Sequence, residues 1–275
     1  MTVLRHDGVE LFYETHGSGP ALLLTHGFAL TAEMWAGQIE VLAPHFQVIT
    51  WDMRGHGRSG SPRDPGAYSR DATVADMARL LEMVGAPDAV LGGLSLGGYM
   101  SLAFHLAHPE RVRALIAVDT GPGFRSDAAR AEWNASAFKT ADQFESDGLT
   151  GAADGNGMAC TAGHRDAQGL AHAARGMLAQ PDTGIIASLP KIAVPTLVVV
   201  GENDVAFLPA ADYMAAKIRG ARKVVIPGAG HIANVDQPEL FNTSMVEFLR
   251  DSALIGQDAT PRGLQSKAGV SMDGA

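Results

Sequence analysis

Short apolar runs alternate along the chain with longer stretches in which apolar residues recur at helical spacing. Runs rich in leucine and β-branched residues predict strands at residues 9–15, 21–26, 46–51, 88–94, 112–118, 194–200 and 222–226. Helical spacing predicts helices at residues 31–43, 71–84, 96–107, 209–218 and 237–250. Strands that alternate with helices are typical of the α/β class, in which helices cover both faces of a mostly parallel sheet.

The alternation stops between residues 121 and 190, where alanine, glycine and scattered charges replace the strand pattern. We interpret this stretch as loosely packed short helices inserted between two strands, and as a lid over a site rather than a plain connection, because long loops in compact domains are usually functional. Residues 1–120 and 191–250 then form the core, with 121–190 as the lid. The tail at 251–275 lacks periodicity and is predicted to be disordered.

Composition restricts the possible partners. The chain has 275 residues, 46% of them hydrophobic, which suits one large domain with a substantial core. Its 30 acidic and 21 basic residues give a net charge of −9, which argues against nucleic acid or an anionic membrane as the partner. No apolar run approaches the roughly 20 residues of a membrane span. A single cysteine, Cys160, cannot form an internal disulfide, and the charged start does not suit a secretory signal, so the sequence predicts a cytoplasmic location.

The segment Gly93–Gly97 reads Gly-Leu-Ser-Leu-Gly and lies between a predicted strand and a predicted helix. This is the context in which a G-x-S-x-G motif forms a sharp turn that exposes its serine as a nucleophile. Ser95 would then lie at the positive end of the helix, where the backbone N–H of Leu96 points at a developing oxyanion. Alternatively, the glycines merely let a helix pack closely.

A serine nucleophile needs a base and an acid that orients the base. His231 follows the strand at 222–226 and is the candidate base. Asp204 follows the strand at 194–200 and is the candidate acid, with Glu202 as a near neighbour. Asp119, directly after the strand at 112–118, is an alternative acid, since it too ends a strand at the same edge of the sheet.

Two further motifs follow strands. Thr25-His26-Gly27-Phe28 offers the backbone N–H of Phe28 as a second oxyanion donor, with Gly27 letting the backbone approach the substrate. The Gly-rich run Asp52–Gly60 lacks the Lys-Ser/Thr of a phosphate loop and is interpreted as a structural turn. No spacing of cysteine, histidine and carboxylate residues indicates a metal site, and no cofactor is expected.

Taken together, these motifs resemble the α/β-hydrolase superfamily over about residues 9–250, with the triad in the order Ser95, Asp204, His231. The resemblance implies a mostly parallel eight-stranded sheet and a helical lid after the sixth strand. The surroundings of Ser95 and His231 look similar to the 3-oxoadipate enol-lactonase and carboxylesterase branch. A serine at position 95 argues against the epoxide hydrolases of this fold, whose nucleophile is usually aspartate.

The resulting hypothesis is hydrolysis of a small carboxylic ester or lactone through an acyl-enzyme. Candidate walls of the substrate pocket are the aromatic residues Phe28, Tyr99, Trp133, Phe138 and Phe207. Four arginines of the lid, Arg125, Arg130, Arg165 and Arg175, are candidates to receive a substrate carboxylate, but the acidic residues around them indicate that most are solvated. The alternatives are a hydrolase of C–C bonds in meta-cleavage products, a perhydrolase or lyase, and a ligand receptor. The sequence does not indicate an oligomeric state.

Overall fold

The computed structural model describes residues 2–153 and 163–256, and within them one sheet has eight strands in the order β1-β2-β4-β3-β5-β6-β7-β8. β1 pairs with β2 and β2 with β4 in antiparallel fashion, and the remaining neighbours are parallel. The predicted α/β class and mostly parallel eight-stranded sheet are therefore confirmed. The strands are β1 (Thr2–His6), β2 (Val9–His16), β3 (Ala21–Thr25), β4 (Gln47–Trp51), β5 (Ala89–Leu94), β6 (Val112–Val118), β7 (Thr196–Gly201) and β8 (Arg222–Ile226).

The strand pattern missed β1, which forms a hairpin with β2. Asp7 and Gly8 make the turn, both with positive φ, at 46° and 74°. β1 lies at the edge of the sheet and buries only Leu4 among its five residues. An edge strand that is exposed along most of its length shows little apolar periodicity, which explains why the pattern did not reveal it.

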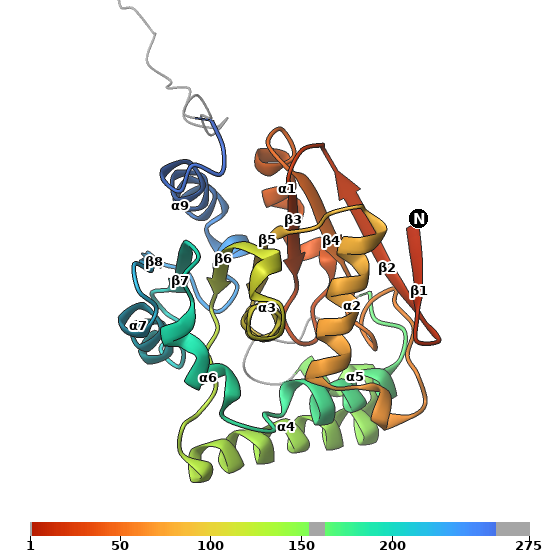
Figure 1. Ribbon diagram of the computed structural model, residues 1–275. Coiled ribbons are helices and arrows are strands. Elements are labelled where there is room, and N and C mark those ends of the chain that lie inside the picture. Colours follow the sequence, from red (N-terminus) through yellow and green to blue (C-terminus); the bar gives the residue numbers. More distant parts are fainter. Residues whose placement is uncertain (1, 154–162, 257–275) are drawn as a thin grey trace, which may run out of the picture.

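Helices cover both faces of the sheet (Figure 1). One apolar cluster joins the sheet to α2, α3 and α7, and a second joins it to α1 and α9. The α-helices are α1 (Ala36–Leu42), α2 (Arg70–Met83), α3 (Leu96–Ala107), α4 (Asp127–Asp147), α5 (Ala167–Ala173), α6 (Gly184–Ser188), α7 (Leu208–Lys217), α8 (Ala233–Asp236) and α9 (Pro238–Asp251). Shorter pieces are the 3-10 helices η1 (Ala32–Trp35), η2 (Pro65–Ala67), η3 (Pro109–Arg111), η4 (Gly148–Ala153) and η6 (Leu189–Lys191), and the π-helix η5 (Ala174–Leu178).

The insertion between β6 and β7 carries α4, α5 and α6, which lie together at the bottom of the view in Figure 1. The expectation of short helices alone was wrong, since α4 runs for 21 residues. Its buried side, with Ala137, Ala141 and Phe144, packs with Leu170 of α5 and with Ala29 after β3. Small residues at helical spacing therefore hold a helix whose sequence showed no clear apolar stripe.

The final helix, α9, ends at Asp251. Of the predicted disordered tail at 251–275, residues from 257 on lie outside the described part, as do residues 154–162 of the insertion and with them Cys160. Within residues 2–153 and 163–256, none of the helices has the length and apolar character that crossing a bilayer requires.

Candidate functional site

Ser95 occupies the turn between β5 and α3 with φ 52° and ψ −115°, a left-handed backbone conformation that is strained for a residue with a side chain. Two hydrogen bonds hold this turn against the end of β6. The N–H of Ser95 donates to the carbonyl of Val118 at 2.8 Å, and the hydroxyl of Thr120 donates to the carbonyl of Ser95 at 2.6 Å. These two hydrogen bonds to the end of β6 and the residues after it therefore stabilise the strained backbone of Ser95.

The glycines around Ser95 are required by close packing. A Cβ on Gly93 would lie 2.2 Å from the backbone carbon of Gly97, and one on Gly97 would lie 2.2 Å from the carbonyl oxygen of Thr25. A Cβ on Gly98 would lie 2.6 Å from Cγ2 of Thr120. These distances are far below any van der Waals contact, so helix α3 can approach β3 and β5 only because these positions lack side chains.

His231 and Asp204 meet at the carboxyl end of the sheet. His231 follows β8 and Asp204 follows β7, and the Nδ1 atom of His231 lies 2.8 Å from Oδ2 of Asp204. The side chains are only 12% and 8% exposed. Because Asp204 accepts the proton on Nδ1, the Nε2 atom of a neutral His231 is left as an acceptor.

Asp119 does not accept a hydrogen bond from His231. It is fully buried at the end of β6, where Oδ1 accepts from the N–H of Gly201 at 2.7 Å and Oδ2 from that of Ala233 at 3.1 Å. Burial, reinforced by the nearby carboxylate of Asp204, raises the pKa of Asp119 to about 8. Asp119 therefore ties the loop that carries Asp204 to the loop that carries His231.

The other near neighbour, Glu202, also does not bind the imidazole. Its Oε2 atom accepts a hydrogen bond from the N–H of Gly228 at 2.9 Å. Of the three carboxylates that the sequence placed near His231, the structure brings only Asp204 into contact with it.

The loop that carries Phe28 lies beside the turn that carries Ser95 as a result of sheet register. Thr25 of β3 pairs with Gly93 of β5, so the residues that follow the two strands emerge side by side. A Cβ on Gly27 would lie 2.9 Å from Cδ2 of Leu94, which shows how closely this loop packs against the end of β5. The ring of Phe28 turns away to pack edge-on against Phe144 of α4, 6.0 Å between centroids.

His26 is a buried support for this loop. Its Nδ1 atom donates to the carbonyl of Gly27 at 2.6 Å, and Nε2 accepts from the N–H of Met53 at 2.9 Å. These partners leave the imidazole no free nitrogen for chemistry. Burial lowers the pKa of His26 to about 4, so the ring is neutral at physiological pH.

The run Asp52–Gly60 forms a turn held by Asp52. One carboxylate oxygen accepts from the N–H of Ala32 at 2.7 Å and the other from the N–H of Arg58 at 2.8 Å. This is the arrangement expected of a structural turn. Among the residues that the structure describes, no group of three or more histidine, cysteine and acidic side chains is placed to hold a metal ion.

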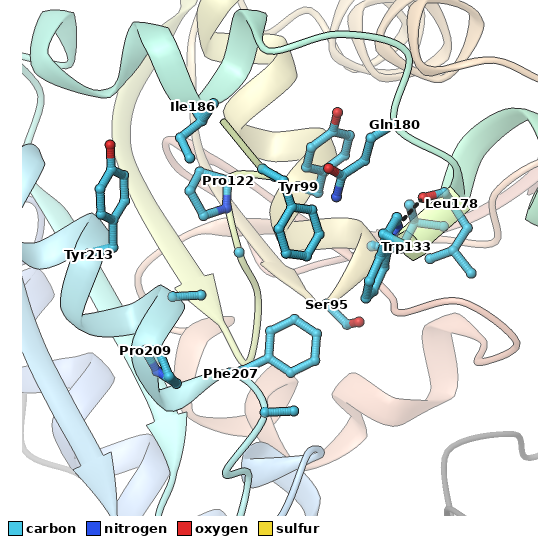
Figure 2. Close-up of a pocket in the computed structure, with 16 residues that line it drawn as sticks. Ser95, Tyr99, Pro122, Trp133, Leu178, Gln180, Ile186, Phe207, Pro209 and Tyr213 are labelled. Atoms are coloured by element: carbon cyan, nitrogen blue, oxygen red, sulfur yellow. Dashed lines mark hydrogen bonds between the residues drawn. The ribbon is translucent and has the colours of Figure 1, made fainter. Parts of the chain in front are cut away.

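A cavity of about 440 Å³ opens over Ser95 (Figure 2). The core contributes the turn that carries Ser95 and the start of α7, and the insertion contributes the loop after β6 and the opposite wall. Its lining is largely apolar: Ser95, Leu96, Tyr99, Gly121, Pro122, Gly123, Phe124, Trp133, Leu178, Gln180, Ile186, Ala206, Phe207, Pro209, Ala210 and Tyr213. The ring of Phe207 also stacks on His231 with centroids 4.8 Å apart, which places the imidazole at the edge of this cavity.

Three of the predicted aromatic walls, Tyr99, Trp133 and Phe207, line the cavity. The other two, Phe28 and Phe138, do not lie on the cavity wall. Phe28 packs against Phe144, and Phe138 is 43% exposed on α4. Phe138 follows Ala137 of the buried side, and one residue along a helix turns a side chain by about 100°. The aromatic count alone could not reveal which side of α4 faces the core.

Sequence reasoning missed Gln180, which lines the cavity and is only 7% exposed. Asn134 of α4 fixes its backbone, donating to the Gln180 carbonyl at 3.0 Å and accepting from its N–H at 2.7 Å. Trp133 is fixed similarly, by donating to the carbonyl of Leu178 at 2.9 Å. The sequence around Gln180 carries no motif that would have singled it out.

Comparison with known proteins places these features in context. The model of the alpha/beta hydrolase fold matches residues 20–151. An esterase from Thermogutta terrifontis, solved with malate bound, is 31% identical, with a TM-score of 0.77 over 91% of this chain and 97% of that one. The 3-oxoadipate enol-lactonase 2 of Acinetobacter baylyi is 29% identical over 88% of this chain and 94% of its own length. The pimeloyl-[acyl-carrier protein] methyl ester esterase of Nitrosospira multiformis is 28% identical over 88% and 99%.

Proposed function

The chain belongs to the α/β-hydrolase superfamily, and from this premise we propose that it is a serine hydrolase that cleaves a small carboxylic ester or lactone. The observation that carries the proposal is the hydrogen bond between His231 and Asp204 at the edge of the cavity that Ser95 lines. Relatives named esterase and enol-lactonase support a hydrolase of this kind.

In the proposed mechanism, the Oγ atom of Ser95 attacks the ester carbonyl carbon while Nε2 of His231 accepts the hydroxyl proton. Asp204 holds the imidazole in the required tautomer through Nδ1 and stabilises the imidazolium that forms. The tetrahedral intermediate collapses, the C–O bond to the alcohol breaks, and His231 returns the proton to the departing alcohol oxygen. The product at this stage is an acyl-enzyme on Ser95.

The second half of the reaction repeats the first with water. His231 accepts a proton from the attacking water, and the acyl–Ser95 bond breaks as the proton returns to the serine oxygen. This releases the acid and restores the enzyme. For a lactone, the alcohol and the acid leave as one molecule, because the ring opens in the first step.

In both halves, negative charge develops on the carbonyl oxygen. The proposed donors are the backbone N–H of Leu96, in the first turn of α3 where N–H groups lack helical partners, and the backbone N–H of Phe28. The register of β3 with β5 supports this pairing, because it places the two loops next to each other. The apolar cavity would exclude water and strengthen these interactions.

The decisive experiment compares Ser95→Ala with Ser101→Ala on 4-nitrophenyl acetate. Ser101 is a matched control: it is buried on α3, where its hydroxyl only donates to the carbonyl of Gly97 at 2.9 Å. We expect Ser95→Ala to lose hydrolysis by at least about 10³-fold and Ser101→Ala to retain it. In parallel, a fluorophosphonate probe should add its mass to the peptide that contains Ser95. Undiminished hydrolysis by folded Ser95→Ala protein would disprove the assignment.

A panel of substrates separates the proposed reaction from its rivals. A C–C bond hydrolase would turn over a meta-cleavage product much faster than simple esters, and a lyase that relies on His231 alone would retain its activity in Ser95→Ala. We propose ester or lactone cleavage as the main activity. We also propose that the protein works in the cytoplasm, because its single cysteine cannot form the internal disulfide that is typical of proteins in oxidising compartments.

A further inference from the structure

A second cavity of about 340 Å³ adjoins the one above Ser95. The two cavities share Ile186 of α6 and Tyr213 of α7 in their walls. In Figure 2, Tyr213 lies on the far side of the first cavity from Ser95. A molecule that reacts at Ser95 and extends past Tyr213 would therefore enter the second cavity.

The second cavity is distinguished by its cations. Arg125 and Lys217 both line it, and its wall contains no acidic residue. Each cation follows a residue that lines the first cavity: Arg125 comes directly after Phe124, and Lys217 lies one helical turn beyond Tyr213. The loop after β6 and helix α7 thus each offer an apolar side chain near the serine and a cation farther away.

These two cations differ in position or pairing from the other three arginines of the insertion. Arg165 lines neither cavity and donates to the backbone carbonyl of Arg58 at 3.5 Å. Arg130 pairs with Asp127 at 2.5 Å, and Arg175 pairs with Asp142 and Glu145 at 2.5 Å and 2.8 Å. Among the described residues, neither Arg125 nor Lys217 forms an ion pair, although the chain as a whole carries a net charge of −9.

The ammonium of Lys217 lies instead 5.7 Å from the ring centroid of Tyr213. In such an acidic chain, two unpaired cations that face one cavity are available to an anion from outside.

We propose that the second cavity is a subsite for an anionic group at the end of the substrate's acyl chain. Resting on the proposed function, this inference names the substrate class: esters or lactones of acids that carry a second, terminal carboxylate. The ester carbonyl lies at Ser95, the apolar chain crosses the first cavity, and the carboxylate binds Arg125 and Lys217. A guanidinium offers paired donors that match a carboxylate, and the ammonium adds a second charge.

The test compares matched substrates. The 4-nitrophenyl monoesters of dicarboxylic acids, from succinic to sebacic acid, are measured beside the 4-nitrophenyl esters of monocarboxylic acids with the same number of carbons. The quantity of interest is the ratio of kcat/KM for the acidic ester to kcat/KM for its neutral partner. The variants are Arg125→Gln, Lys217→Gln and the two combined. The control is Lys139→Gln combined with Arg219→Gln, which removes two exposed cations that line neither cavity.

We expect the ratio to rise at chain lengths that reach past Tyr213. At these chain lengths the kcat/KM ratio should be about five- to tenfold lower in the double variant than in wild type. A larger loss is not expected, because exposed ion pairs are individually weak. The ratio should stay unchanged in the control, and the wild-type preference should weaken at high salt. An equal ratio in wild type and double variant at every chain length would overturn the subsite.

Failure of the subsite and failure of the proposed function give different results. If the subsite alone is wrong, the enzyme hydrolyses both ester series through Ser95 with no dependence on Arg125 and Lys217. If the function is wrong, both ester series are poor substrates or are not hydrolysed at all, and titration calorimetry with adipate then tests the subsite directly. Binding that the Arg125→Gln/Lys217→Gln variant loses would support the subsite, and equal heats in both proteins would reject it.

Discussion

The Nδ1 atom of His231 lies 2.8 Å from Oδ2 of Asp204, although the two residues are 27 positions apart and follow different strands. β7 and β8 are parallel neighbours, so their carboxyl ends lie side by side and bring the two loops together. If Asp204 holds the imidazole for catalysis, Asp204→Asn should lower kcat by about 10³- to 10⁴-fold, because the amide favours the wrong tautomer. Steady-state kinetics on 4-nitrophenyl acetate measures this.

Glu202→Gln is the control for this variant. Glu202 lies two residues earlier and accepts a hydrogen bond from the N–H of Gly228, which a glutamine oxygen can also accept. Its kcat should stay within about twofold of wild type, since it does not touch His231. Equal losses in both variants would show that the loop as a whole, rather than the carboxylate on His231, is what matters.

Asp119 is expected to affect stability more than chemistry. Asp119→Ala would leave the buried N–H groups of Gly201 and Ala233 without acceptors, at a cost of about 2–5 kcal/mol in the free energy of unfolding. In Asp119→Asn the amide oxygen can accept only one of these hydrogen bonds, while its NH₂ faces the other donor. Urea unfolding monitored by fluorescence gives the free energies.

The pH dependence of the Asp119→Asn variant provides a second check. The folded-state pKa of Asp119, about 8, lies above the ordinary value of 3.8. The wild type therefore loses stability from this group as the pH rises from about 4 to about 8, whereas asparagine has no proton to lose. The stability difference between the two proteins should narrow over that range. A constant difference would mean that Asp119 is already ionised in the folded protein.

The choice between Asp204 and Asp119 marks the limit of what the sequence could predict about the site. Asp119 comes directly after β6, and Asp204 lies in the loop after β7. Because parallel strands end at one edge of the sheet, both carboxylates were plausible partners for His231. Side-chain direction decides between them. Asp119 has φ 43° and points between the loops at the backbone N–H of Gly201 and Ala233, which no residue pattern reveals.

Prediction was most successful where strands are buried and weakest in the insertion. The buried strands β3 to β7 appear as continuous apolar runs, so their positions were clear from the sequence. In the insertion, α4 buries only three of its residues, and alanine at two of them gives little signal. Phe138 was therefore wrongly expected in the pocket, and Gln180 was overlooked.

His26 should make the protein less stable in weak acid. Its folded-state pKa, about 4, lies below the ordinary value of 6.5, so between these values the unfolded chain binds a proton that the folded chain excludes. Stability from this group is full above pH 6.5 and falls as the pH drops to about 4, by about 3 kcal/mol. His26→Gln, which removes the titration, should flatten the profile of unfolding free energy in this window.

The packing at Gly97 gives a sharp prediction about folding. Gly97→Ala would place a methyl group 2.2 Å from the carbonyl oxygen of Thr25. The methyl group is attached to the backbone of α3 and the oxygen belongs to the backbone of β3, so neither can move aside by a side-chain rotation. We expect a loss of at least about 3 kcal/mol or failure to fold. Gly37→Ala is the control. Gly37 lies in α1, and the atom nearest to an added Cβ would be Cβ of Pro238, at 3.9 Å. It should be neutral or stabilise by up to about 1 kcal/mol, as thermal unfolding would show.

The amide of Gln180 is expected to lower the free energy of unfolding and to contribute to substrate recognition. It is 7% exposed, and among the described residues its Oε1 atom has no hydrogen-bond partner. Gly123 leaves room for it, since a Cβ there would lie 2.8 Å from this oxygen. A buried acceptor without a donor costs about 1–3 kcal/mol, so Gln180→Leu should raise the free energy of unfolding by about 1 kcal/mol.

The same variant should lose selectivity for substrates that can satisfy this amide. Gln180 lines the cavity, and a hydroxyl on the acyl chain can form a hydrogen bond with its amide. Wild type should therefore favour a hydroxylated 4-nitrophenyl ester over its unsubstituted partner at the chain position that reaches Gln180. Gln180→Leu should reduce that preference by about two- to tenfold through KM while kcat on the unsubstituted ester stays the same. A variant that is more stable yet equally selective would show that the amide faces the cavity without taking part in binding.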